Sequence, residues 1–295
     1  MSVFNDDSAL PTTSNSHRYY QPSGRIPTMG AAIMFGTGLA GALVLAFLYA
    51  LIDYYIPSFK LRFMVSLLFC MGIGWWGYKC SKWGKIRHRA YSALVGFCIG
   101  VCTLYFAWMW FVFLLSGWNP QTLFPQPMAL WKLIEEIRNQ GLWAVKEAVI
   151  SPGRLAFFWS VEAFLVIGIS TLVASAPTDP FCESCHSWAK TAAQHLCGLD
   201  DLAALVSQLE SENFETLPTV LSRPAAETCL VFTVNSCPHC DESHYLNLEL
   251  RTINPESKES SDLPIIRHLS IPADVAEMVR TAKTTQAPTE PSNNS

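Results

Sequence analysis

Four long apolar segments dominate the pattern of hydrophobic and polar positions in the first 175 residues. About 20 apolar residues, at roughly 1.5 Å each, are enough for a helix to cross the hydrocarbon layer of a bilayer. Shorter polar connections separate the segments. The pattern therefore predicts a four-helix transmembrane domain over residues 28–175, with spans at about Ala31–Ile52, Leu61–Tyr78, Tyr91–Trp118 and Leu155–Ala174.

Small residues recur in the first span at helical spacing. Gly36 pairs with Ala40, and Gly38 pairs with Ala42, each four positions apart. Pairs of small residues at this spacing let the backbones of two membrane helices approach closely. We expect them to pack against a neighbouring helix.

The connection between the third and fourth spans carries a second periodic pattern. Near residues 128–148, apolar residues recur every three or four positions and alternate with Lys, Arg and Glu. Such a segment is typical of an amphipathic helix that lies in the membrane interface, with its apolar face toward the lipid.

A basic loop between the second and third spans sets the predicted topology. The stretch Lys79–Arg89 holds five Lys and Arg residues. Short loops rich in these residues stay on the cytoplasmic side of a membrane. Four spans then place both termini in the cytoplasm and the connection 119–154 outside; in a bacterial cell this membrane would be the inner membrane.

Composition agrees with a membrane protein. Half of the 295 residues are hydrophobic and 15% are charged, whereas soluble domains average about 25% charged residues. The charge is uneven, at +6 for residues 1–175 and −10 for residues 176–295. An acidic C-terminal region argues against nucleic-acid binding, which needs a basic face.

The polar parts of the chain divide into two tails and one domain. Residues 1–27 are expected to be a flexible cytosolic tail, and residues 284–295 a disordered one. Residues 176–283 are predicted to form a small α+β domain in the cytosol. Its predicted elements are helices at 200–211, 214–221 and 273–283, with Asp200 or Asp201 as a cap of the first, and strands at 228–234, 245–253 and 263–271.

Two Cys-x-x-Cys pairs are the strongest chemical signal in this domain. They are Cys182 with Cys185, and Cys237 with Cys240, the second pair between two predicted strands. Two such pairs supply the four thiolates of a closed, tetrahedral zinc site. The arrangement resembles the zinc-ribbon type of site, which implies one structural zinc ion. The 51 residues between the pairs exceed the usual 15–20, so a helical insert would have to loop out and return.

Histidines and other cysteines lie near this predicted site. His186, His239 and His244 are each able to replace a ligand, although a satisfied surface imidazole is the simpler state. Cys197 and Cys229 have no partner at Cys-x-x-Cys spacing and are expected to be small buried hydrophobes.

A redox role is the alternative for the second pair. Cys237-Pro238-His239-Cys240 after an apolar strand resembles the active site of thioredoxin-fold thiol oxidants, in which a helix follows and lowers the pKa of the first thiol. Here the alternating leucines after residue 244 predict a strand. Thiols without any ligand are the third possibility.

Glu162 is the notable ionisable group of the predicted spans. A charge inside lipid is costly, and such residues commonly serve transport or proton transfer. A small transporter that uses Glu162 is therefore a further alternative. A protonated glutamic acid bonded to a neighbouring helix is the structural one.

The combined prediction is a multi-pass membrane protein in the bilayer with a zinc-ribbon-like cytosolic domain. No phosphate-binding loop, nucleophile elbow or open His/Glu metal motif is present in the sequence. We expect a scaffold or regulatory module that binds a cytosolic protein rather than an enzyme. The alternatives are a membrane-anchored thiol-disulfide oxidoreductase and a transporter.

Overall fold

The chain forms two compact units. The computed structural model describes residues 18–56, 58–140, 144–145, 148–149, 151–176, 179–226, 228–253 and 260–282. One unit is Ser23–Thr178, and the other joins the N-terminal residues up to Pro22 to Asp179–Ser295.

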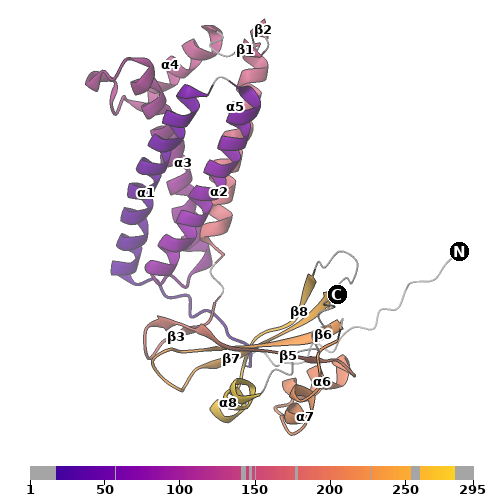
Figure 1. The fold of residues 1–295 in the computed structure, drawn as a ribbon. Helices are drawn as coiled ribbons and strands as arrows, with labels where there is room; N and C mark the ends of the chain where they lie inside the picture. Colours follow the sequence, from indigo (N-terminus) through magenta and orange to yellow (C-terminus); the bar gives the residue numbers. More distant parts are fainter. Residues whose placement is uncertain are drawn as a thin grey trace, which may run out of the picture. The chain divides into compact units, whose positions relative to one another are not determined.

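The first unit is built around four long helices, which run side by side (Figure 1). Each is long and apolar enough to cross a membrane. The helices are α1 (Thr28–Tyr55), α2 (Phe59–Trp83), α3 (Arg89–Leu115) and α5 (Pro152–Ala174). This confirms the four predicted apolar helices. The third ends at Leu115, earlier than expected, because Gly117 and Trp118 adopt left-handed backbone angles that a helix cannot continue through.

Small residues set the packing of this bundle. Helix α1 buries every fourth residue, and a side-chain carbon built on Gly38 would meet Ile99 of α3 at 2.3 Å. Ala42 is buried as well, whereas Gly36 and Ala40 are exposed. Of the two predicted pairs, only Gly38 with Ala42 therefore lies at a helix contact within this unit.

The basic loop is a packed turn rather than an open one. Helix α2 continues through Lys79 to Trp83, which leaves five residues before α3. Arg87 donates from its backbone N–H to the Arg25 carbonyl at 3.2 Å and from Nε to Ser23 Oγ at 3.0 Å. The segment before α1 is thus attached to the loop, and Arg25 joins its positive charges.

The amphipathic pattern forms a shorter helix than expected. A 3₁₀ turn, η1 (Pro120–Thr122), precedes α4 (Pro127–Gln140), which contacts α3 and α5. Its apolar face buries Leu130 and Ile137. The rest of the predicted helix 128–148 instead includes a pair of two-residue strands, β1 (Ala144–Val145) and β2 (Ala148–Val149); residues 141–143, 146 and 147 lie outside the described part.

An antiparallel sheet with strand order β5-β6-β7-β8 forms the second unit. The strands are β5 (Lys190–Gly198), β6 (Thr228–Ser236), β7 (His244–Ile253) and β8 (Ser260–Ser270). The last three correspond to the predicted strands. A separate small hairpin, β3 (Phe181–Cys182) with β4 (Ser187–Trp188), precedes the sheet.

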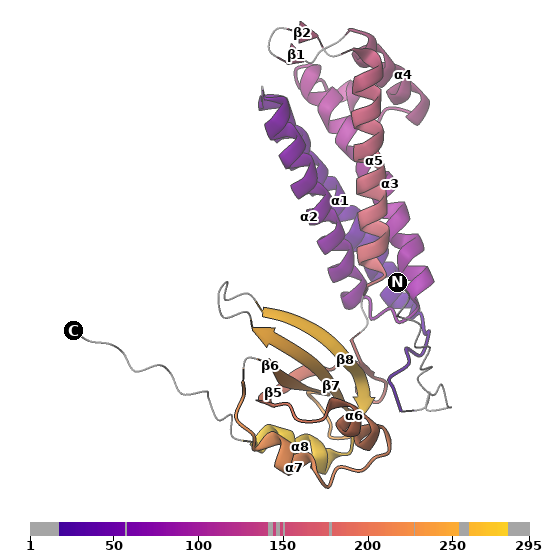
Figure 2. The same ribbon diagram turned by 90° about the vertical axis from the view of Figure 1, so that its right-hand side faces the viewer.

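Three helices cover one face of this sheet (Figure 2). They are α6 (Leu202–Glu210), α7 (Leu217–Leu221) and α8 (Ala273–Thr281). Asp201 caps α6 by accepting a hydrogen bond from the Ala204 N–H at 3.0 Å, as one of the two expected caps. Phe232, Leu246 and Leu248 are fully buried in the core between sheet and helices.

Residues near the N-terminus add to the edge of the sheet. The Tyr20 N–H donates to the His268 carbonyl at 2.9 Å, and the Ser270 N–H donates to the Arg18 carbonyl at 2.8 Å. Tyr19 Oη donates to Glu210 Oε1 at 2.6 Å. Within the predicted tail of residues 1–27, residues 18–20 thus have defined partners in this unit, and residues 1–17 lie outside the described part.

Candidate metal centre

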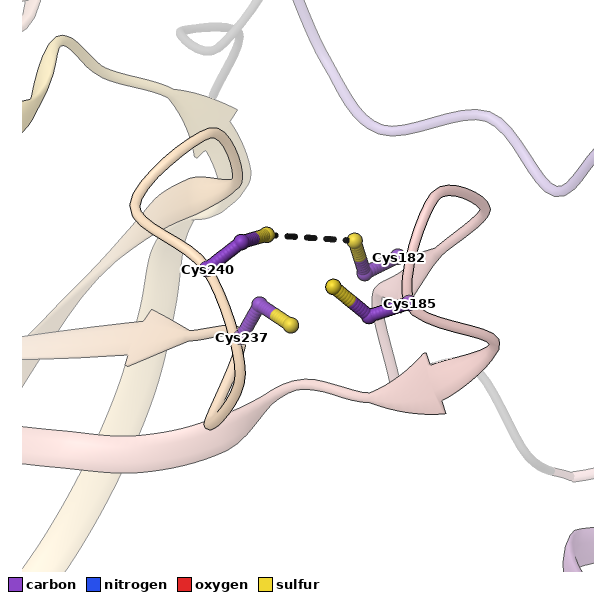
Figure 3. Close-up of side chains that lie close together, drawn as sticks. All are labelled: Cys182, Cys185, Cys237 and Cys240. Atoms are coloured by element: carbon purple, nitrogen blue, oxygen red, sulfur yellow. Dashed lines mark hydrogen bonds between the residues drawn. The ribbon is translucent and has the colours of Figure 1, made fainter.

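Two hairpins bring the four predicted cysteines together (Figure 3). Cys182 ends β3 opposite Ser187 of β4, and Cys185 lies in the turn between these strands. Cys237 and Cys240 lie in the turn between β6 and β7, where the Cys237 N–H donates to the Ser243 carbonyl at 3.1 Å. Each pair therefore sits on its own tight turn, and the two turns face each other.

The sheet explains how pairs 51 residues apart meet. Strand β5 starts just after the first hairpin, and its Lys190 lies opposite Ser236 at the end of β6. The second turn begins at the next residue. The chain therefore leaves along β5, crosses through α6 and α7, and returns along β6 to the same place. The predicted helical insert is corrected in this respect, because its residues Lys190–Gly198 form strand β5.

The sulfur positions suit a metal–thiolate centre. The four ligand atoms all lie within 4.8 Å of one another, and the Cys182 and Cys240 sulfurs are 3.6 Å apart. A tetrahedral centre with metal–sulfur bonds of about 2.3 Å has sulfur–sulfur edges of about 3.8 Å. A disulfide bond measures about 2.05 Å, and all ten cysteines of the chain are free. These four cysteines could hold one metal ion.

The four thiols differ in their surroundings. Cys182 and Cys237 are buried, and Cys185 and Cys240 are half-buried. Burial raises the pKa of Cys237, but hydrogen bonds from Ser187 Oγ at 3.3 Å and from backbone N–H groups outweigh it and lower that pKa to about 6. Hydrogen bonding with Cys240, together with the other thiols, raises the pKa of Cys185 to about 12. The site therefore already favours a thiolate at Cys237.

His244 supports the second turn without being a ligand. Its ring is buried, with Nε2 2.9 Å from the Asp241 carbonyl and Nδ1 2.8 Å from Ser236 Oγ. Because the carbonyl can only accept, Nε2 carries the proton and Nδ1 accepts from the serine hydroxyl. Arg280 Nη2 then donates to Ser236 Oγ at 2.8 Å. Both ring nitrogens of His244 thus have hydrogen-bond partners, as expected, but the ring lies in the interior rather than on the surface.

The first hairpin is held by contacts that the sequence did not reveal. Phe181 and Trp188 meet edge to face at its base, with ring centroids 4.9 Å apart. The Ala189 N–H donates to the Pro180 carbonyl at 2.8 Å. Across the site, Ser184 Oγ donates to Glu242 Oε2 at 3.1 Å. This last bond links the two turns directly.

The remaining candidate residues do not belong to the cluster of four sulfurs. His186 and His239 are exposed. Cys197 and Cys229 are fully buried in the sheet, as expected, and burial raises the pKa of Cys197 to about 12. Glu162 lies in α5 of the other unit.

In comparisons with known proteins, no family model matches the chain, and no curated protein or solved structure matches it either.

Proposed function

We propose that the chain is a multi-pass membrane protein whose C-terminal unit is a cytosolic, zinc-ribbon-like module that docks a protein partner. The observation that carries this proposal is the convergence of four cysteine sulfurs from two turns, one in the small β3–β4 hairpin and the other between β6 and β7 of the four-stranded sheet. The four long apolar helices supply the anchor.

Zinc fits the donor set best. Four thiolates are soft ligands that favour zinc over magnesium or calcium, and a four-coordinate site filled by protein leaves no position for a substrate. The resident ion would be held by Cys182, Cys185, Cys237 and Cys240, and it would crosslink the two hairpins. Its role is then structural, and the affinity of the site for zinc contributes directly to the stability of the fold.

The basic end of the bundle supports the cytosolic location. Lys79, Lys82, Lys85, Arg87 and Arg89 gather around one short connection, and Arg25 is attached to it. By the positive-inside rule this end faces the cytoplasm. Free thiols persist in that reducing compartment, which agrees with ten unpaired cysteines.

The charge of the C-terminal region points to the kind of partner. Residues 176–295 carry a net charge of −10. An acidic module attracts a protein with a basic surface and repels nucleic acid, and this attraction weakens as salt is added. We therefore assign the module a scaffold or regulatory role.

A thiol-disulfide oxidoreductase is the second candidate. The lowered pKa of Cys237 favours it, since a thiolate is the attacking species in disulfide exchange. Against it, β7 rather than a helix follows the pair, and two further thiols lie within 4.8 Å of it. If Cys237→Ser abolished a dithiol-exchange activity of the metal-loaded chain, the redox function would replace the structural one.

The metal content of the full-length chain, purified in detergent under reducing conditions, tests the proposal. We expect about one zinc per chain, lost when Cys182 and Cys185 are both changed to serine. The matched control changes Cys98 and Cys102 to serine, which removes two thiols from α3 and should leave the zinc in place. A metal-free wild-type chain would contradict the proposal.

A protease test in membrane vesicles addresses the location separately. Inside-out vesicles should expose the C-terminal unit to cleavage, and right-side-out vesicles should protect it. The reverse pattern would contradict the cytosolic assignment.

A further inference from the structure

A cavity of about 440 Å³ lies inside the helical unit, at the end of the bundle where α1 and α3 finish and α5 begins. Residues of α4, such as Leu130, Trp131 and Ile134, line it on one side, and this helix packs against α3 and α5 (Figure 2). This volume is typical of sites for small organic molecules. The walls are mostly aromatic and aliphatic, with only a few charged groups.

Two of the acidic groups in the wall already have a cation. Asp53 lies 3.6 Å from Arg62, between Oδ1 and Nε. Glu135 lies 3.2 Å from Arg138, between Oε1 and Nη2. In each pair the positive and negative charges cancel, so neither carboxylate needs a charged ligand as its partner.

Glu162 is different. Its Oε1 accepts hydrogen bonds from the hydroxyls of Tyr49 and Ser66, the latter at 3.1 Å. Among the residues that the structure describes, no Lys or Arg forms an ion pair with it, and its Oε2 accepts no hydrogen bond. The cavity therefore has one acidic group that two neutral hydroxyls hold in place. No sequence pattern marks Tyr49 and Ser66 as partners of this residue.

Aromatic rings surround the same space. Trp108 and Trp159 both line the cavity and meet edge to face, with ring centroids 4.7 Å apart. Trp131 of α4 and Phe111 of α3 extend the aromatic wall. The faces of such rings attract cations, tryptophan most strongly. A carboxylate beside an aromatic wall is the combination that recognises an organic cation.

We propose that this cavity binds a small organic monocation, an amine or quaternary ammonium with an apolar body. Glu162 supplies the counter-charge, the Trp108–Trp159 pair supplies the aromatic wall, and the aliphatic lining accepts the body of the ligand. The site is independent of the cysteine centre.

The test compares two probes of nearly the same shape and opposite charge. Tetraphenylphosphonium, a cation, and tetraphenylborate, an anion, are titrated into the full-length chain in detergent, and equilibrium dialysis separates saturable binding from uptake by micelles. We expect saturable binding of about one tetraphenylphosphonium per chain and none of tetraphenylborate.

Variants locate the binding. Glu162→Gln should weaken tetraphenylphosphonium binding about tenfold or more, because it removes the counter-charge in a partly dry site. Glu136→Gln, the same change of charge at an exposed position of α4 outside the cavity lining, should leave the affinity unchanged. Trp159→Leu should weaken binding about fivefold or more.

Three results would overturn the proposal. They are no saturable binding of the cation, equal binding of both probes, and an affinity that Glu162→Gln leaves unchanged. If Glu162→Gln fails to fold, two other measurements still test the proposal. They are the comparison of the two probes on the wild-type chain and the affinity of the Trp159→Leu variant for tetraphenylphosphonium.

Discussion

The change His244→Ala tests how the second cysteine turn is held. The imidazole is 3% exposed and bridges the end of β6 to the turn through hydrogen bonds at 2.8 and 2.9 Å. Two such bonds contribute about 1 kcal/mol each, and the cavity left by the ring adds a similar amount. We therefore expect the free energy of unfolding to fall by about 3 kcal/mol.

The same change should also weaken metal binding. Groups that orient a ligand-bearing turn typically alter metal affinity by about 10-fold to 100-fold when they are removed. The assay is competition for zinc between the full-length chain and a chromogenic chelator, combined with chemical unfolding of the same preparation. Both quantities are measured for the wild-type chain and the variant.

His195→Ala is the matched control. His195 is also a buried histidine, with Nε2 2.7 Å from the Leu221 carbonyl, but it lies on β5 opposite Phe232 and outside the two turns that carry the metal-site cysteines. The His195→Ala variant should lower the free energy of unfolding by a comparable amount and leave the zinc affinity close to wild type. Equal zinc affinities in the two variants would refute the positioning role of His244.

Two further predictions concern other parts of the chain. Gly96→Ala should destabilise the helical unit by about 1–3 kcal/mol, because its new carbon would lie 2.6 Å from the Ser170 carbonyl. The control is Gly72→Ala, whose new carbon meets nothing within 4 Å. Equal unfolding midpoints of the two variants in detergent would contradict the packing of Gly96 against Ser170. Burial lowers the pKa of His268 below 6.5, although the nearby Asp179 carboxylate opposes this shift. The unfolded chain therefore binds a proton at His268 more tightly than the folded chain does. The free energy of unfolding should then fall as pH drops from about 7 to about 5. His268→Asn tolerates the φ of 58° at this position and should show a smaller loss over that range; identical pH profiles of unfolding would exclude this contribution.

The apolar helices and the four cysteines were predictable because each depends on local sequence. A run of about 20 apolar residues specifies a long apolar helix whatever surrounds it. Two Cys-x-x-Cys pairs likewise indicate a shared metal site through their spacing. The strands β6 and β7 carry β-branched residues or alternating leucines, and their pattern is equally local.

Strand β5 could not be predicted in the same way. Residues 190–198 read Lys-Thr-Ala-Ala-Gln-His-Leu-Cys-Gly, with neither a β-branched run nor regular alternation. The segment is a strand because it pairs with the buried strand β6 over most of its length, an example of tertiary context overriding local propensity. The sequence predicts that the segment between the cysteine pairs loops out and returns, but it does not show that the outgoing part is a strand paired with β6.

Partners distant in sequence were hidden for the same reason. Tyr49 lies 113 positions from Glu162, and Tyr19 lies 191 positions from Glu210. No local pattern marks such pairs, because only the packing of complete helices and the sheet edge brings them together. The role of His244 was equally invisible, since its distinguishing property is burial.

X-ray absorption spectroscopy at the zinc edge of the purified full-length chain tests the central claim most directly. We expect one zinc per chain, with four sulfur neighbours at about 2.3 Å. A shell containing nitrogen or oxygen ligands, or fewer than four sulfurs, would contradict the assignment of Cys182, Cys185, Cys237 and Cys240 as a closed centre.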